Sequence, residues 1–566
     1  MERSFCSYFF LLGLINCAPL NLNEQLTVVK VDAVQNTSKF SYKSPISNDE
    51  VLKQDKNFWI NMAENTLKKN LELEAEAKEF KNAKNIIIFI GDGMGVSTIT
   101  AGRIYKGQQE FGIAGEEHEF TFDKFPNIAL VKTYNVDMQV PDSAGTATAL
   151  FTGVKTRYKA IAVDVNCNKT TFDKEVYENS KLESLMTWAQ AANKDTGIVT
   201  TTRITHATPA ATYAHATYRY WECDEELPLD VVGNAKDIAR QLIEDAPGTN
   251  FKVILGGGQQ LLGHTSESTG PCTRQDGLNL TNDWIQNHYN SNYVFATNNE
   301  ELSNVNDDTE YLLGLFSPGH MPYELVRDNG PTGAPSLTDM TRKALQILKK
   351  GQNGFVLMVE GGLIDQAHHK NYARLAMAET AEFDNAISLA LNETGPDTLI
   401  IVTADHSHSF TMEGYSKRGN DILGYTDEAG EEDRPFLTLA YANGPGFDYH
   451  YGINVSNNTY PWRDTRYDEN RLNDPYYAHI GAFQSKDDTH GGEDVAVFAK
   501  GPHANLIRGV VEQNYIAHLI SYAGCFGPQA YLNPDCDLQK TSGGSIFDIS
   551  VGVVTLLLLT TVANML

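Results

Sequence analysis

Basic residues are scarce in this chain relative to acidic ones. Its 566 residues include 45 lysines and arginines against 72 aspartates and glutamates, which gives a formal net charge of −27. A surface this negative repels nucleic-acid backbones and anionic membranes, so we expect neither as a partner. An anionic ligand would require local positive charge, from metal ions or from a suitably placed arginine.

Long apolar runs occur only at the two ends of the chain. Met1-Glu2-Arg3 precedes an apolar run over residues 5–15 and small residues at Cys17 and Ala18. This pattern predicts a signal peptide over residues 1–17 with cleavage after Cys17, and the alternative is a buried N-terminal helix.

At the C-terminal end, the small residues Ser-Gly-Gly-Ser at 542–545 come before an uncharged apolar tail over 551–566. No lysine or arginine marks a cytoplasmic side. We predict a stalk over 537–550 with a glycosylphosphatidylinositol (GPI) anchor at Ser542 or Gly543, and removal of the tail. The alternative is a transmembrane helix. The lipid anchor predicts a protein of the cell surface, on the outer leaflet of the plasma membrane.

Cysteine is rare as well, with seven residues in the whole chain. Removal of the signal peptide leaves five, and Cys525 and Cys536 are close enough in sequence to form a disulfide in an exported protein. The pairing among Cys167, Cys223 and Cys272 stays open. Acceptor sites for N-linked glycans, which agree with the secretory route, occur at Asn36, Asn168, Asn279, Asn392, Asn454 and Asn457.

Short apolar runs and helical patterns alternate through the middle of the chain. The runs, which are typical of buried strands, occur at 86–90, 196–200, 251–255, 355–359, 398–403 and 495–499, and helical patterns lie at 182–192, 337–350 and 374–391. This alternation predicts an α/β fold with a mostly parallel central sheet. We assign residues 85–410 and 485–536 to the core, 18–84 to an extension with a helix, and 411–484 to an insertion.

Potential metal ligands stand at the ends of four of these strands. Asp92 follows the first run, Glu360, Asp365 and His369 follow 355–359, Asp405, His406 and His408 follow 398–403, and His490 precedes 495–499. Ligands bind at the carboxyl ends of parallel strands. Carboxylates and imidazoles without cysteine suit zinc, with oxygen-rich positions for magnesium, and cooperating metals of this kind clamp a phosphoryl group during in-line displacement.

Ser143 is the candidate nucleophile, in the segment Val140-Pro-Asp-Ser-Ala-Gly-Thr-Ala-Thr148. The small residues after it predict the start of a helix, and a helix N-terminus favours anions. A serine in this place is also an ordinary helix cap, which is the alternative if no metals bind nearby.

Six separated motifs together resemble those of animal alkaline phosphatases, in the same order and over residues 58–536. They are Gly-Asp-Gly-Met-Gly at 91–95, Asp-Ser with Thr-Ala-Thr at 142–148, Thr-His-Ala-Thr-Pro at 205–209, Glu-Gly-Gly at 360–362 with Asp365 and His369, Asp-His-Ser-His at 405–408 and His-Gly-Gly-Glu at 490–493. The resemblance implies a homodimer with a three-layer α/β/α sandwich, an N-terminal helix and a crown-like insertion. It also implies a phosphate-monoester hydrolase that passes through a phosphoserine.

The resemblance assigns a role to each candidate residue. Ser143 is the implied nucleophile and Arg219 the arginine that holds phosphate. A first zinc ion is assigned to Asp365, His369 and His490, a second to Asp92, Asp405 and His406, and one magnesium ion to Asp92, Thr208 and Glu360. His206, Gln366 and His408 are assigned to the layer around these ligands, where such groups orient them.

Two departures from the family pattern affect what we expect. Gln366 stands where vertebrate members have histidine and bacterial members have lysine, so rate and pH optimum are open. Ser317 and Ala334 stand where an additional calcium site has acidic residues, so we expect no calcium. The competing interpretations are a phosphodiesterase, sulfatase or phosphoglycerate mutase with the same metal core, which lack this Ser143 motif, or an inactive surface receptor, which would have lost a ligand or Ser143.

Overall fold

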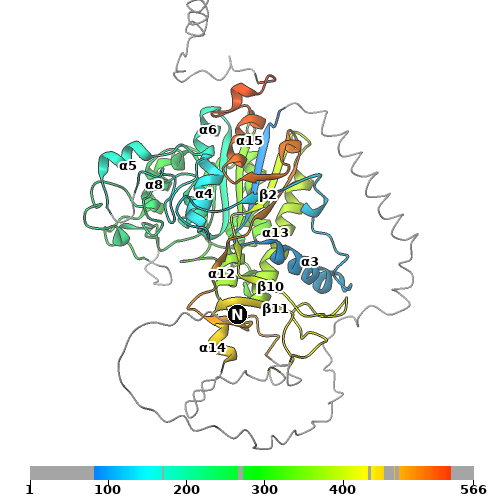
Figure 1. Ribbon diagram of the computed structural model, residues 1–566. Coiled ribbons are helices and arrows are strands. Elements are labelled where there is room, and N and C mark those ends of the chain that lie inside the picture. The colour runs from blue at the N-terminus through cyan, green and yellow to red at the C-terminus, as the bar shows by residue number, and fades with distance from the viewer. Residues whose placement is uncertain are drawn as a thin grey trace, which may run out of the picture. The chain divides into compact units, whose positions relative to one another are not determined.

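The computed structural model describes residues 82–167, 171–264, 272–430, 435–451, 465 and 471–536 (Figure 1). The predicted signal peptide, N-terminal helix, stalk and apolar tail lie outside these residues. So do the glycosylation sites Asn36, Asn168, Asn454 and Asn457.

The centre of the fold is a ten-stranded sheet with the strand order β15-β2-β14-β8-β1-β7-β3-β4-β6-β5. The strands are β1 (Asn85–Gly91), β2 (Asn127–Lys132), β3 (Asp195–Arg203), β4 (Val253–Gly257), β5 (Tyr293–Ala296), β6 (Tyr311–Leu315), β7 (Phe355–Gly361), β8 (Thr398–Ala404), β14 (Val495–Lys500) and β15 (Val510–Glu512). Neighbouring strands are parallel except at β14, which is antiparallel to both β8 and β2. The predicted mostly parallel α/β sheet is confirmed.

The central strands form because their sequences are apolar on both faces. All residues of β7 and β8 are buried, and β1 is buried from Ile86 to Gly91. Strands covered by helices on both faces require such continuous apolar runs. The run predicted at 251–255 forms a strand two residues later, because a 3-10 turn over Gly248–Asn250 precedes it.

Helices cover both faces of the sheet, which gives the predicted three layers. Helix α13 (Ala373–Glu393) packs against α3 (Val96–Phe111) and α11 (Leu337–Leu348), while α15 (Tyr515–Gly524) packs against α4 (Ser143–Thr152) and α6 (Leu185–Ala191). Figure 1 shows α3 and α13 on one side of the sheet and α4 and α6 on the other. The remaining described helices are α5 (Lys174–Ser180), α7 (Ala207–Ala210), α8 (Ile238–Glu244), α9 (Leu280–Asn287), α10 (Asn299–Ser303), α12 (Leu363–His369) and α14 (Gly446–His450).

The segment between β8 and β14 forms small sheets of its own. Strands β10 (Phe410–Met412), β11 (Leu439–Gly444) and β12 (Gly481–Gln484) make one sheet, and β9 (Ser407–His408) pairs with β13 (His490–Gly491) in another. The limits 411 and 484 of the insertion stay a prediction from composition. Among the described helices, none has the length and apolar character that a membrane crossing requires.

Two disulfides are present in the described part of the chain. Cys525 is bonded to Cys536, as their short separation predicts. Cys223 is bonded to Cys272, which settles the pairing that the sequence left open. Cys167 is the remaining cysteine there, and it is free and buried.

Candidate active site

Four adjacent parallel strands deliver the candidate ligands to one edge of the sheet. Strand β1 lies between β7 and β8, and β3 lies on the other side of β7. Gly91, at the end of β1, is in register with Gly361 of β7 and Ala404 of β8. Asp92 and Asp405, which directly follow these positions, therefore lie side by side. Because β14 is antiparallel to β8, the segment before it reaches the same edge, and β13 pairs His490 with His408 of β9.

Asp365, His369 and His490 form the first group of converging donors. His369 Nε2 lies 3.3 Å from Asp365 Oδ2, and His490 Nε2 lies 3.4 Å from Asp365 Oδ1 and 3.2 Å from His369 Nε2. Each ring places Nδ1 against a backbone carbonyl, Asp488 O at 2.6 Å for His369 and Pro141 O at 2.8 Å for His490. A carbonyl can only accept, so Nδ1 is the donor in both rings, and the two Nε2 atoms face the same point.

Asp92, Asp405 and His406 form a second group beside the first. His406 Nε2 lies 3.4 Å from Asp92 Oδ1 and 3.2 Å from Asp405 Oδ2, and its Nδ1 faces Ser407 O at 3.2 Å. Burial, followed by the charge of His490, holds the pKa of His406 well below its usual range. The ring is therefore neutral, and its Nε2 lone pair faces two carboxylate oxygens that can also only accept, an arrangement that a bound cation would stabilise.

A third group is defined by buried oxygens that lack partners. Asp92 Oδ2, Glu360 Oε1 and Thr208 Oγ1 are buried, and among the described residues they have no hydrogen-bond partner. Such atoms are costly unless a proton donor or a cation satisfies them. These are the three residues that the family resemblance assigns to magnesium, and Asp92 belongs to the second and third groups through different oxygens.

The electrostatics of the site also call for bound cations. Asp92, Glu360 and Asp405 are fully buried, and burial is the main cause that raises the pKa of Glu360 to about 7 and that of Asp405 to about 6. Burial, with repulsion from Asp405, also raises the pKa of Asp92. Carboxylates this close resist ionisation in a low-dielectric interior, and metal ions remove that penalty. Oxygen and imidazole donors with these orientations fit zinc and magnesium.

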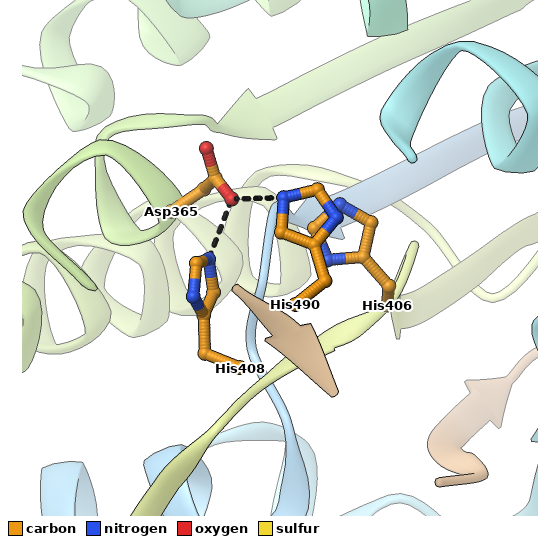
Figure 2. A group of neighbouring side chains, drawn as sticks. All are labelled: Asp365, His406, His408 and His490. Carbon is orange, nitrogen blue, oxygen red and sulfur yellow. Dashed lines mark hydrogen bonds and ion pairs between the residues drawn. The ribbon is translucent and has the colours of Figure 1, made fainter. Parts of the chain in front are cut away.

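His408 lies between two carboxylates and holds one of them in place. Its Nε2 is 2.6 Å from Asp365 Oδ1 and its Nδ1 is 2.8 Å from Asp488 Oδ2. Burial lowers its pKa, but these two hydrogen bonds outweigh burial and raise the pKa to about 9. With both nitrogens donating, His408 has no lone pair for a metal, which fits its predicted orienting role. Figure 2 shows His408 and His490 both directed at Asp365, with the His406 ring stacked on that of His490.

Ser143 is the first residue of α4 and lies beside the second group. Asp142 caps this helix by accepting from Ala144 N and Gly145 N, both at 3.3 Å. Ser143 Oγ lies 3.2 Å from His406 Nε2 and donates to Asp92 Oδ1 at 3.5 Å. The cap is therefore supplied by Asp142, and the Ser143 hydroxyl is directed at the converging donors.

Arg219 is held next to Ser143 by two side chains. Its Nη1 donates to Asp142 Oδ2 at 3.1 Å and its Nη2 donates to His206 Nε2 at 2.8 Å. Burial, followed by the charges of Arg219 and Arg203, holds the pKa of His206 well below its usual range, so its ring is neutral.

Arg219, Ser143 and His206 line a pocket of about 360 Å³. Gln366 lines the same pocket and donates to Asp365 Oδ2 at 2.8 Å. This hydrogen bond ties Gln366 to a residue of the first group.

Sequence reasoning missed two residues that position this site. Asp488 orients His408 through its carboxylate and His369 through its carbonyl. Asp142 holds Arg219 and caps α4. Asp142 precedes Ser143 directly, and the preference for aspartate at helix caps is a signal that predicts part of its role. No comparable signal identifies Asp488, because its contacts depend on how distant segments meet.

Comparisons with known proteins give one consistent result. The family model described as Alkaline phosphatase matches residues 83–526. Alkaline phosphatase 4 of Drosophila melanogaster is 50% identical over 513 residues, which cover 86% of this chain and 84% of that protein. The tissue-nonspecific isozyme of alkaline phosphatase from Homo sapiens is 42% identical over 494 residues, which cover 84% of this chain and 89% of that protein.

Solved structures show the same fold. A cold-active alkaline phosphatase from Shewanella sp. matches with a TM-score of 0.53 at 26% identity, covering 78% of this chain and 99% of its own. The alkaline phosphatase of Thermus thermophilus matches with a TM-score of 0.55 at 22% identity, covering 80% and 93%. From the family match, the identities and the clustered metal donors, this chain belongs to the alkaline phosphatase family and is a metal-dependent hydrolase of phosphate monoesters.

Proposed function

We propose that the protein hydrolyses phosphate monoesters in two in-line displacements through a phosphoserine at Ser143. The observation that carries this proposal is the position of Ser143 Oγ, 3.2 Å from His406 Nε2 and next to the Arg219–Asp142 ion pair. A nucleophile at this place faces both the second donor group and the arginine that binds phosphate.

The three donor groups support a content of two zinc ions and one magnesium ion. Asp365, His369 and His490 would hold the first zinc ion. Asp92, Asp405 and His406 would hold the second, and Asp92, Thr208 and Glu360 would hold magnesium. Ions bound in such sites supply charge stabilisation to phosphoryl oxygens and lower the pKa of a nearby hydroxyl.

The residues of the chain then have distinct tasks. The planar fork of Arg219 binds two phosphoryl oxygens, and Asp142 and His206 fix its orientation before substrate arrives. In the first displacement a bond forms between Ser143 Oγ and phosphorus as the bond to the alcohol oxygen breaks. In the second, a water oxygen bonds to phosphorus and Ser143 Oγ is released, which yields inorganic phosphate.

The proposal extends to an exported homodimer at the cell surface, attached by a GPI anchor at Ser542 or Gly543. The sequence of both chain ends supports export and anchoring. Asn392 is exposed at the end of α13 and is open to a glycan, whereas Asn279 uses its side chain to cap α9. A second copy is supported by a stretch of exposed apolar side chains, Ile128, Leu130, Tyr134, Val136, Met138 and Val140.

An inactive receptor of the same fold is less well supported, because every predicted ligand and Ser143 are present in the site. Turnover of a generic aryl phosphate across pH, before and after chelation, distinguishes the hydrolase from the inactive receptor. We expect activity that chelation abolishes and that zinc with magnesium restores. Absence of activity in the metal-loaded protein would favour the receptor.

A further inference from the structure

One cation in the active-site pocket has no carboxylate partner among the residues that the structure describes. Four lysine or arginine side chains line this pocket, and three of them form ion pairs: Arg203 with Glu222, Arg219 with Asp142 and Lys370 with Asp487. Lys159 is the fourth, and within the described part of the chain it forms no ion pair. In a protein with a net charge of −27, a free positive charge inside a phosphate-binding pocket requires an explanation.

The backbone of Lys159 is fixed to the residues that bind phosphate. Its N–H donates to Asp142 Oδ1 at 2.8 Å, and its carbonyl accepts from Arg219 N at 2.9 Å. An isolated bridge between Ile161 and Ala216 joins the same two segments. The position of Lys159 relative to the Arg219 guanidinium is therefore set by the main chain.

Lys159 also adopts a conformation that side chains disfavour. Its φ is +70°, in the left-handed region, where glycine is favoured over residues with a Cβ. Strained backbone of this kind persists where surrounding structure holds it, and it is concentrated at functional sites. A lysine therefore occupies a position whose backbone conformation favours glycine.

Three tyrosine rings surround the ammonium group without neutralising it. Lys159 Nζ lies 5.1 Å from the ring centre of Tyr220, 5.2 Å from that of Tyr158 and 5.8 Å from that of Tyr218. Tyr220 and Tyr158 line the same pocket, and the Tyr220 side chain is exposed to solvent. Cation–π contacts orient a charge while leaving it available to an anion.

We infer that Lys159 and its tyrosines form a subsite for the leaving group, which favours phosphate monoesters whose alcohol carries a second anionic group, a carboxylate or a further phosphate. This inference rests on the proposed function, since Ser143 and Arg219 take the phosphoryl group and the rest of the substrate lies toward the pocket wall. It names a substrate class that metal ions held by the three donor groups would not select, because they would act on the phosphoryl group and not on the rest of the alcohol.

The test compares two substrates that differ by one charge, 4-carboxyphenyl phosphate and its isosteric amide, 4-carbamoylphenyl phosphate. The readout is the ratio of their kcat/KM values in the metal-loaded enzyme. Lys159→Gln and Lys159→Gly should each lower the ratio about two- to fivefold, the range for a partly exposed ion pair. Lys159→Arg should retain it. Glycine is favoured at this φ of +70°, so we expect the glycine variant to fold and to separate loss of the charge from loss of the fold.

Lys181 offers a matched control outside this pocket, because its ammonium also lies over a tyrosine, 4.6 Å from the ring centre of Tyr177. Lys181→Gln removes the same unit of charge and should leave the ratio unchanged. Rising salt should reduce the wild-type preference toward that of Lys159→Gln. An unchanged ratio in both Lys159 variants, with both substrates hydrolysed, would overturn this inference alone. Failure of the wild type to hydrolyse either substrate would instead overturn the proposed function.

Discussion

The guanidinium of Arg219 is paired with the carboxylate of Asp142, whose Oδ2 lies 3.1 Å from Arg219 Nη1. The other oxygen of Asp142 accepts from Gly145 N in α4 and from Lys159 N. One side chain therefore fixes the arginine, the helix that begins with Ser143 and the segment of Lys159. The geometry for holding phosphate exists before substrate binds, which reduces the cost of ordering these groups on binding.

Removal of the arginine should weaken phosphate binding more than it impairs the chemistry. For Arg219→Ala we expect inhibition by inorganic phosphate to weaken about ten- to a hundredfold, from the loss of about 1.5–3 kcal/mol in hydrogen bonds to a charged group. Arg219→Lys keeps the charge but not the planar fork, and it should be intermediate. The measurement is the inhibition constant of phosphate for each variant. Unchanged inhibition in Arg219→Ala would place phosphate elsewhere.

Stability at alkaline pH should depend on Glu379, a buried residue of α13. Burial is the main cause that raises its pKa to about 8, and its Oε1 accepts from Glu324 N at 2.6 Å. The pKa in the folded state lies above the unfolded value of 4.5. The protonated group therefore contributes stability at pH below 4.5, and that contribution is lost as pH rises through about 8.

Glu379→Gln should accordingly raise the melting temperature at pH 9 and change it little at pH 5, because glutamine keeps an acceptor without the charge. Glu393→Gln is the matched control, since Glu393 lies at the end of the same helix and pairs with Lys349 at 3.1 Å. Thermal unfolding of all three proteins at both pH values provides the measurement. A melting temperature at pH 9 that does not rise in Glu379→Gln would show that this carboxyl is not a source of alkaline instability.

Calcium should change neither stability nor activity once zinc and magnesium are saturating. Ser317 and Ala334 offer no carboxylates, and their carbonyl oxygens already accept hydrogen bonds, from Gly258 N at 2.9 Å and from Arg327 Nη1 at 2.8 Å. Calcium binds through six to eight oxygens, several of them charged. Differential scanning fluorimetry at fixed zinc and magnesium checks this, and a melting temperature that rises with calcium would refute it.

The mature protein should be released from intact cells by a phosphatidylinositol-specific phospholipase. This expectation rests on the small residues at 542–545 and the uncharged tail. The measurement is phosphatase activity in the medium after treatment, with untreated cells as the control. Activity that stays with the membrane, together with peptides from 551–566 in the mature protein, would indicate a spanning helix.

The fold was predictable where strands are buried on both faces. The runs at 86–90, 355–359 and 398–403 match β1, β7 and β8, because burial on both sides demands continuous apolar sequence. Strands β5 and β15 are short and partly exposed, so they leave no such run. The antiparallel direction of β14 relative to β8 and β2 depends on how the chain connects these strands, which no local sequence pattern encodes.

In the candidate site as well, residues that follow buried strands were predictable and residues placed by long-range pairing were not. Ligands such as Asp92 and Asp405 were predictable because they directly follow buried strands, whose carboxyl ends share one edge. The contact of Asp488 with His408 joins residues 80 positions apart. It depends on the pairing of β13 with β9, a two-residue bridge without a sequence signature.

The most direct test of the account is to trap the phosphoenzyme. Enzyme incubated with radiolabelled phosphate at mildly acidic pH, quenched and digested, should yield label on the peptide that contains Ser143. Ser143→Ala should lose the label and most of the turnover while its zinc content stays near that of the wild type, because Ser143 is not among the zinc donors. Label on another residue, or near-normal turnover of Ser143→Ala, would contradict the assignment of Ser143 as the nucleophile.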